Sequence, residues 1–259
     1  MRKVSSTLLL LMMSFSLMSL IVRHDVSDEK FITLAKKYPQ TVNLNIGGSG
    51  LGESTLIKEN WLVTAAHAAV YLKEEMETGE ISKVTIDTKQ YDIEKVIIHP
   101  NYKLNEGESV IKNDIALIKI KGRITHIPYA KLYDKQDEKG KKITIVGRGD
   151  FGTALTDAVK SDGINRAATN KIDKVSRQWI RFKFDSPESE NTTELEGVSA
   201  NGDSGGPAFI DVNNVRYIVG VSSHQLNDDD ENVEEHLYGV NEYYARISSY
   251  KKWIEKYIK

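Results

Sequence analysis

The segment Gly202-Asp203-Ser204-Gly205-Gly206-Pro207 tells more about the fold than any other part of the chain. Glycines on both sides of Ser204 permit a tight backbone turn, because glycine adopts conformations that other residues avoid. Such a turn presents the serine hydroxyl to a ligand and leaves neighbouring backbone N–H groups free to point in the same direction. The segment therefore predicts an accessible hydroxyl backed by backbone donors.

Two segments upstream contain groups that could activate this hydroxyl. His67 ends the run Thr64-Ala65-Ala66-His67, and Asp114 lies in the run Asn113-Asp114-Ile115-Ala116-Leu117. A serine hydroxyl is a weak nucleophile that a histidine base activates, and an aspartate orients that histidine. Each residue alone also has a structural explanation, as a turn serine, a core histidine or a strand-end aspartate. Together, and in this order, they favour a nucleophilic site.

The three segments resemble those of the trypsin/chymotrypsin family of serine endopeptidases. The spacings are similar, since 47 residues separate His67 from Asp114 and 90 separate Asp114 from Ser204. Further matches run from about residue 42 to the C-terminus, at Ser54-Thr55-Leu56-Ile57, Trp61, His99-Pro100, Gly147-Arg148-Gly149 and Trp253-Ile254.

The resemblance implies an all-β fold of two packed six-stranded antiparallel barrels with a C-terminal helix. On this basis residues 21–259 form a peptidase domain, with barrels over about 42–123 and 131–245 and the helix over about 248–259. The apolar pattern is consistent with this fold, because short stretches of alternating apolar residues recur between turn residues. Helical spacing is strong only at the end, in Tyr250, Trp253, Ile254, Tyr257 and Ile258.

The resemblance also implies a role for each site residue. Ser204 is expected to attack a peptide carbonyl, with His67 as the base and Asp114 as the group that orients it. The backbone N–H groups of Gly202 and Ser204 are expected to form the oxyanion hole. The expected partner is a protein or peptide substrate, no cofactor is expected, and the histidine spacing predicts no metal site.

Specificity is less clear from the sequence. In the family the residue six before the serine forms the floor of the pocket for the residue before the scissile bond (P1). Here that residue is Val198, followed by Ser199, which favours an uncharged P1 residue. Glu242, however, stands where the family usually has glycine, and could select basic residues from the opposite wall. The alternative is that Glu242 points to solvent and that Gly239 is the pocket glycine.

The strand Gly220-Val221-Ser222-Ser223 corresponds to the wall of that pocket. We expect Ser222 to lie in the pocket and to hydrogen-bond Asp114. Ser223 or His224 then replaces the tryptophan that the family has at the next position, which predicts a more polar subsite.

Asp203 raises the question of activation. In the family this carboxylate pairs with a new α-amine released by cleavage of a zymogen, and Ile21-Val22 is the nearest substitute for the usual start. Removal of an export signal could therefore produce the activating terminus at Ile21. Cleavage after Arg23, or an internal cation beside Asp203, are the alternatives.

Composition favours export. The chain has 259 residues, no cysteine and a formal net charge of −2. Residues 1–20 resemble a signal peptide, with Arg2 and Lys3 before an apolar stretch, although an uncleaved membrane anchor is the alternative. The absence of cysteine excludes thiol chemistry and suggests a bacterial secreted or periplasmic protein without stable membrane association after signal removal. The negative charge argues against a nucleic-acid partner.

Two further readings stay open at this stage. Residues 227–235 carry six acidic side chains, which favour a solvated loop but could attract basic substrates or bind calcium. A catalytically silent or zymogen-locked binding protein on the same fold is the alternative function. The sequence predicts no oligomeric state.

Overall fold

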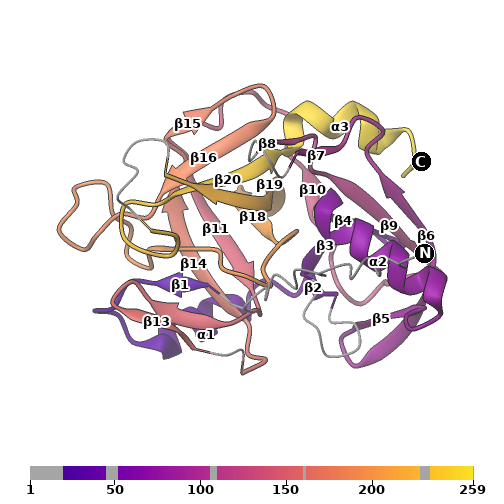
Figure 1. Cartoon of the computed structure of the whole chain (residues 1–259), viewed down its shortest axis with the longest axis horizontal. Coiled ribbons are helices and arrows are strands. Elements are labelled where there is room, and N and C mark those ends of the chain that lie inside the picture. Colours follow the sequence, from indigo (N-terminus) through magenta and orange to yellow (C-terminus); the bar gives the residue numbers. More distant parts are fainter. Residues whose placement is uncertain (1–19, 45–51, 106–109, 160–161, 228–233, 259) are drawn as a thin grey trace, which may run out of the picture.

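Two antiparallel sheets form the two halves of the molecule, with helix α3 (Ile247–Glu255) lying across them (Figure 1). The structure is a computed structural model that describes residues 20–44, 52–105, 110–159, 162–227 and 234–258. In the described part of the chain, no helix is long and apolar enough to cross a membrane.

The first sheet has six strands, and its end strands β2 and β5 lie against each other, so that it nearly closes into a barrel. In spatial order these strands are β2 (Thr41–Asn43), β3 (Glu53–Lys58), β4 (Trp61–Thr64), β9 (Ala116–Ile120), β6 (Lys89–Ile98) and β5 (Lys83–Ile86). Successive side chains of a strand face opposite sides. Leu62 of β4 accordingly packs inside this barrel, whereas Val63 packs in the core shared with the second sheet and α3.

The second sheet has eight strands. Its strands are β14 (Arg166–Lys171), β11 (Lys142–Gly147), β18 (Pro207–Val212), β19 (Val215–Leu226), β20 (Asn241–Arg246), β16 (Trp179–Lys183) and β15 (Lys174–Val175), with β10 (Lys131–Leu132) paired to β19. Phe182, Tyr244 and Ile145 are among the buried residues that fill its interior. The predicted all-β fold with two barrel-like sheets and a C-terminal helix is confirmed, but the second sheet has eight strands rather than the expected six and forms a half-barrel.

Two smaller sheets complete the strands. A hairpin is formed by β7 (Lys103–Asn105) and β8 (Val110–Lys112). The other sheet has the order β13-β12-β1-β17, from strands β13 (Thr156–Val159), β12 (Phe151–Thr153), β1 (Ile21–Val22) and β17 (Gly197–Val198). It places Ile21 opposite Val198, so that the start of the described chain lies beside the segment that leads to Ser204.

Two helices were missed by the sequence analysis, which found a strong helical pattern only at the C-terminus. Helix α1 (Asp28–Ala35) buries only Phe31 and Ala35, and α2 (Ala66–Thr78) buries mainly alanines. The apolar stripe is weak in both helices, because α1 buries only two residues and the small alanine side chains of α2 contribute little to the helical pattern. Gly79 ends α2 in the left-handed conformation (φ 80°), which glycine adopts without strain.

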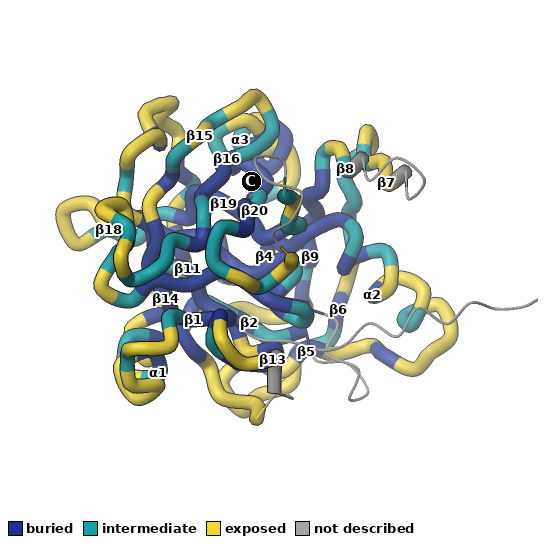
Figure 2. The backbone as a smooth tube through the Cα atoms, turned by 60° about the vertical axis from the view of Figure 1, so that its left-hand side comes forward, coloured by how far each residue is buried: buried dark blue, intermediate teal, exposed yellow. Residues whose placement is uncertain are grey.

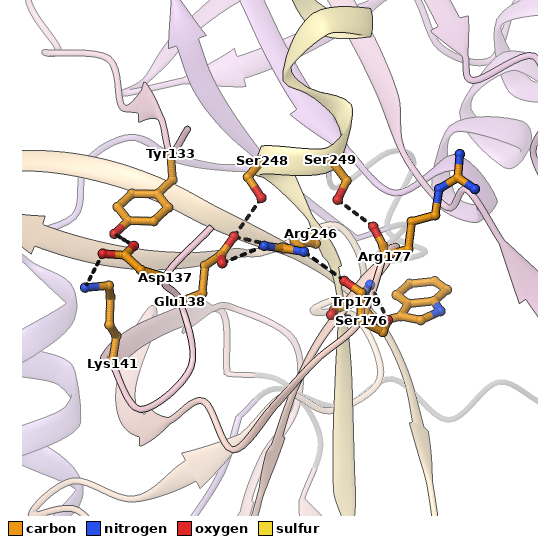
Figure 3. A network of polar contacts seen from close by, with 10 residues as sticks. All are labelled: Tyr133, Asp137, Glu138, Lys141, Ser176, Arg177, Trp179, Arg246, Ser248 and Ser249. Atoms are coloured by element: carbon orange, nitrogen blue, oxygen red, sulfur yellow. Dashed lines mark hydrogen bonds and ion pairs between the residues drawn. The ribbon is translucent and has the colours of Figure 1, made fainter. Parts of the chain in front are cut away.

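Burial is concentrated in the strands of both sheets, while the connecting loops are exposed (Figure 2). One buried ion pair fixes the end of β20. Glu138 is fully buried, and both of its carboxylate oxygens accept hydrogen bonds from Arg246 at 2.8 Å (Figure 3). Ser248, in the first turn of α3, also donates to Glu138 at 2.6 Å. This network holds the junction of β20 and α3.

Candidate active site

His67 and Asp114 are brought together by adjacent strands. Thr64 at the end of β4 pairs with Ala116 at the start of β9 in antiparallel register. His67 follows β4 by three residues and Asp114 precedes β9 by two, so both leave the sheet at the same end. His67 is the second residue of α2, which starts directly after β4. The sequence prediction that these residues meet is consistent with this topology.

Asp114 holds the histidine by two hydrogen bonds. The backbone N–H of His67 donates to Asp114 Oδ1 at 2.9 Å, and the ring Nδ1 lies 2.8 Å from Oδ2. Burial alone would lower the pKa of His67, but the neighbouring Asp114 carboxylate outweighs it and raises the pKa above the ordinary value. Burial likewise favours protonation of Asp114, but the contacts with His67 and a hydroxyl donor lower its pKa overall. The pair therefore suits a histidine that is neutral before it takes up a proton, because the Asp114 carboxylate stabilises the protonated ring.

That hydroxyl donor is Ser223, and the expectation that Ser222 would bond Asp114 is wrong. Ser223 Oγ donates to Asp114 Oδ2 at 2.6 Å, whereas Ser222 Oγ donates to Ser199 Oγ at 3.1 Å. Neighbouring side chains on a strand point to opposite faces, so only one serine can face Asp114. Because the register of β19 shifts between Ser222 and His224, the alternation of side chains along the strand does not predict which of the two serines faces Asp114.

Ser204 sits in a turn that packs against the end of β4. A Cβ atom on Gly205 would lie 2.2 Å from Thr64 Oγ1 and 3.0 Å from the amide nitrogen of Ala65, two residues before His67. The same turn is bonded to β19, since Gly205 N–H donates to the carbonyl of Ser222 at 3.0 Å. Ser204 is thus placed between the segments that carry His67 and Ser223. Both His67 and Ser204 are partly accessible to solvent.

The backbone around Ser204 leaves donors available. Gly202 has φ 91° and Gly205 has φ 84°, conformations that favour glycine. Among the residues described, none accepts a hydrogen bond from the N–H of Gly202 or Ser204. The neighbouring N–H of Asp203 is used, since it donates to Ala200 O at 3.0 Å. Both N–H groups predicted for the oxyanion hole are therefore without an acceptor in the described part of the chain.

The residues predicted for the specificity pocket lie together and are almost completely buried. They are Val198, Ser199, Ser222 and Glu242, none more than 5% exposed. The alternative that Glu242 points to solvent is wrong, because it is fully buried and its Oε1 accepts a 2.6 Å hydrogen bond from Ser199. Burial raises the pKa of Glu242 to about 8. Gly239 instead bonds its N–H to the carbonyl of Phe184, at the edge of the second sheet.

Comparison with known proteins decides the family. A family model described as trypsin matches residues 33–254. The chain belongs to the trypsin family.

Among its relatives, trypsin-1 of Salmo salar is 32% identical over 179 residues, which cover 66% of this chain and 71% of the relative. Vitamin K-dependent protein C of Rattus norvegicus is 27% identical over 78% of this chain, and transmembrane protease serine 11E of Mus musculus is 26% identical over 85%. The chain spans about half the length of these last two relatives.

Asp203, the residue before Ser204, is a buried aspartate. Asp203 accepts hydrogen bonds from the N–H groups of Ala200 at 3.0 Å and Gly149 at 3.1 Å. Burial raises the pKa of Asp203 to about 8, and a second buried carboxyl, Glu53, has its pKa raised to about 8 by burial and by Asp203. Glu53 Oε1 accepts a bond from Asn43, while Oε2 is buried without a hydrogen-bond partner among the described residues. Two buried acids therefore flank the base of the serine turn.

Sequence reasoning missed Ser223 as the Asp114 donor, Glu53 beside Asp203, and Gln225. Gln225 Nε2 donates to the carbonyl of Ser199 at 2.7 Å and to Glu242 Oε2 at 2.8 Å. Glu53 gave no signal, because β3 is buried on both faces and a single glutamate at its start does not show that its side chain is buried as well. Gln225 could not be placed by its spacing along β19, because the register shift between Ser222 and His224 puts it with the Ser199–Glu242 cluster that Ser222 contacts rather than with Asp114.

A catalytic metal has no evident site. In the described segments no group of three or more histidine, aspartate or glutamate side chains could hold an ion. Most of the acidic segment over 227–235, considered above for calcium, lies outside the described residues.

Proposed function

We propose that this chain is an exported serine endopeptidase that hydrolyses peptide bonds through a Ser204–His67–Asp114 triad. The observation that carries the proposal is the buried Asp114 carboxylate, which bonds both the ring and the backbone of His67 beside the turn that holds Ser204. Membership of the trypsin family supports the same chemistry.

In the proposed reaction, each of these residues has one role. Ser204 Oγ bonds to the scissile carbonyl carbon while its proton moves to His67 Nε2. The carbonyl oxygen becomes an oxyanion that the N–H groups of Gly202 and Ser204 stabilise, a contribution of about 2.7–4 kcal/mol for each donor. His67 then gives its proton to the leaving amine as the C–N bond breaks. Water attacks the acyl-enzyme by the same route, with His67 again as the base, and releases the acid and Ser204.

For the P1 residue we propose a preference for uncharged side chains. Val198 offers no charge to a basic P1 residue. Glu242 is present, but Ser199 and Gln225 already donate to its two oxygens. With a pKa raised to about 8 by burial, its carboxyl is mostly protonated at neutral pH. The basic-P1 alternative would require these contacts to open.

For activation we propose that removal of residues 1–20 leaves Ile21 at the new N-terminus, with its α-amine available to Asp203. Ile21 is 1% exposed and pairs with Val198 and Gly152, and Val198 belongs to the segment that leads to Ser204, which supports this proposal. A buried carboxyl whose pKa burial has raised is stabilised as the anion by a nearby cation. Mass spectrometry of the exported protein tests this, and a mature start several residues from Ile21 would exclude it.

The test of the activity is cleavage of an unfolded protein by the exported, purified chain. We expect activity in the wild type and a loss of several orders of magnitude in Ser204→Ala and Asp114→Asn, because neither variant retains a working triad. Asp134→Asn is the matched control, since it makes the same change at an exposed carboxylate. A folded wild type without hydrolytic activity would instead favour the catalytically silent binding protein.

A further inference from the structure

The side chain of Gln225 connects the two walls of the specificity pocket. It projects from β19, two residues beyond Ser223, and its cross-strand partner on β20 is Glu242. The opposite wall is the segment after β17, where Ser199 lies five residues before Ser204. Gln225 Nε2 donates to Ser199 O at 2.7 Å and to Glu242 Oε2 at 2.8 Å. The carboxamide therefore spans the space between the walls.

All polar atoms of this carboxamide are engaged. Nε2 uses its two donors as described, and Oε1 accepts a bond from the backbone N–H of His236 at 3.1 Å. A primary amide has two N–H donors and one carbonyl acceptor, so the orientation is fixed by all three. Gln225 as a whole is half-buried.

Beneath this amide, Glu242 is closed off from solvent. It is fully buried, and Ser199 and Gln225 each donate to one of its oxygens. Ser222 Oγ completes the cluster by donating to Ser199 Oγ at 3.1 Å. With Gln225 in place, a P1 side chain meets an amide whose donors are already used, rather than a carboxylate.

We propose that Gln225 is the specificity-determining residue of this pocket: its carboxamide covers Glu242 and restricts P1 to small uncharged side chains. The inference rests on the proposed protease function and deepens it. A longer P1 side chain must displace the amide and break its three hydrogen bonds, one of them to a buried acid. A guanidinium would reach Glu242 only after that displacement.

Truncation of the Gln225 side chain should open Glu242 to the pocket. Without the carboxamide, Glu242 keeps Ser199 as a donor but loses Gln225 and gains access to the pocket. A buried acid that has lost a donor favours a cationic partner, which the side chain of arginine or lysine supplies. Removal of the amide should therefore change the preference from small uncharged residues to basic ones, and only while Glu242 is present.

The first readout is binding, because it does not depend on catalysis. n-Butylguanidine, the arginine side chain as a free ligand, is titrated into wild type, Gln225→Ala, and the double variant with Glu242→Gln. We expect Gln225→Ala to bind at least tenfold more tightly than wild type, and the double variant to lose the gain. Leu226→Ala, at the exposed neighbouring position, is the matched control and should behave as wild type.

The second readout is hydrolysis of peptides that differ only at P1, with alanine, leucine, lysine or arginine. The ratio of kcat/KM for arginine over alanine should rise at least tenfold in Gln225→Ala. In the double variant it should return to the wild-type value. An unchanged ratio and affinity, a gain that persists without Glu242, or a wild type that already prefers arginine would each overturn the role of Gln225. If no variant hydrolyses any peptide, the protease function fails, while the butylguanidine titration still decides the role of Gln225.

Discussion

Gly205→Ala tests how the serine turn is held against β4. A Cβ atom at this position would lie 2.2 Å from Thr64 Oγ1 and 2.3 Å from Glu53 O. Thr64 Oγ1 donates a 2.7 Å hydrogen bond to Glu53 O, so neither atom can move independently. The backbone of Gly205 also has φ 84°, which costs a non-glycine residue about 1–2 kcal/mol.

The two contributions can be separated by a control. Gly140 has φ 80°, and a Cβ atom there would meet nothing within 4 Å. Gly140→Ala should therefore cost only the backbone contribution of about 1–2 kcal/mol. Gly205→Ala adds overpacking of about 1–3 kcal/mol, for a total of about 2–5 kcal/mol.

Equilibrium unfolding in urea measures both variants. We expect the midpoint to fall further for Gly205→Ala than for Gly140→Ala, with similar slopes. Hydrolysis should be lost in Gly205→Ala, because relief of the clash moves Ser204, and retained in Gly140→Ala. Equal destabilisation, or full activity in Gly205→Ala, would refute the proposed packing of the turn on β4.

The remaining predictions concern the buried polar groups. Ser223→Ala should lower the free energy of unfolding by about 1–3 kcal/mol, because the buried Asp114 carboxylate loses a donor. The loss should be larger than that of Ser222→Ala, and urea unfolding measures both. When the pH rises from about 4.5 to 8, Glu242→Gln should lose less folding stability than the wild type. In that window the folded wild type retains a proton that the unfolded chain releases, so stability falls as pH rises, by up to about 5 kcal/mol for this shift. Thermal unfolding across that pH range checks the sign, and a wild type that becomes more stable relative to Glu242→Gln at alkaline pH would contradict it. Glu138→Gln should destabilise the junction of β20 and α3 by about 3–5 kcal/mol, since it breaks a buried pair with Arg246; an unchanged urea midpoint would exclude that role.

The architecture could be predicted because the motifs are local and the strand pattern repeats. The turn around Ser204 requires glycines that are visible in the sequence, and the two barrels follow from the family that those motifs indicate. Helix α2 was missed, because its buried face consists mainly of Ala66, Ala68 and Ala69, which resemble neither a strand nor a strong amphipathic helix.

The polar contacts inside the site could not be predicted from sequence alone. The choice between Ser222 and Ser223 depends on a register shift in β19. The burial of Glu242 depends on three segments far apart in the chain, which supply Ser199, Gln225 and the glutamate itself. Glu53 and Asp203 meet only because β3 packs under the serine turn. Such contacts are tertiary, and residue type carries little information about them.

Labelling with a fluorophosphonate tests whether Ser204 is a nucleophile that His67 activates. The exported, folded protein is treated with the probe, digested and mapped by mass spectrometry, beside His67→Ala. We expect a single adduct on Ser204 in the wild type and none in the variant. An unlabelled wild type whose mature N-terminus is Ile21, or an adduct at another residue, would contradict it.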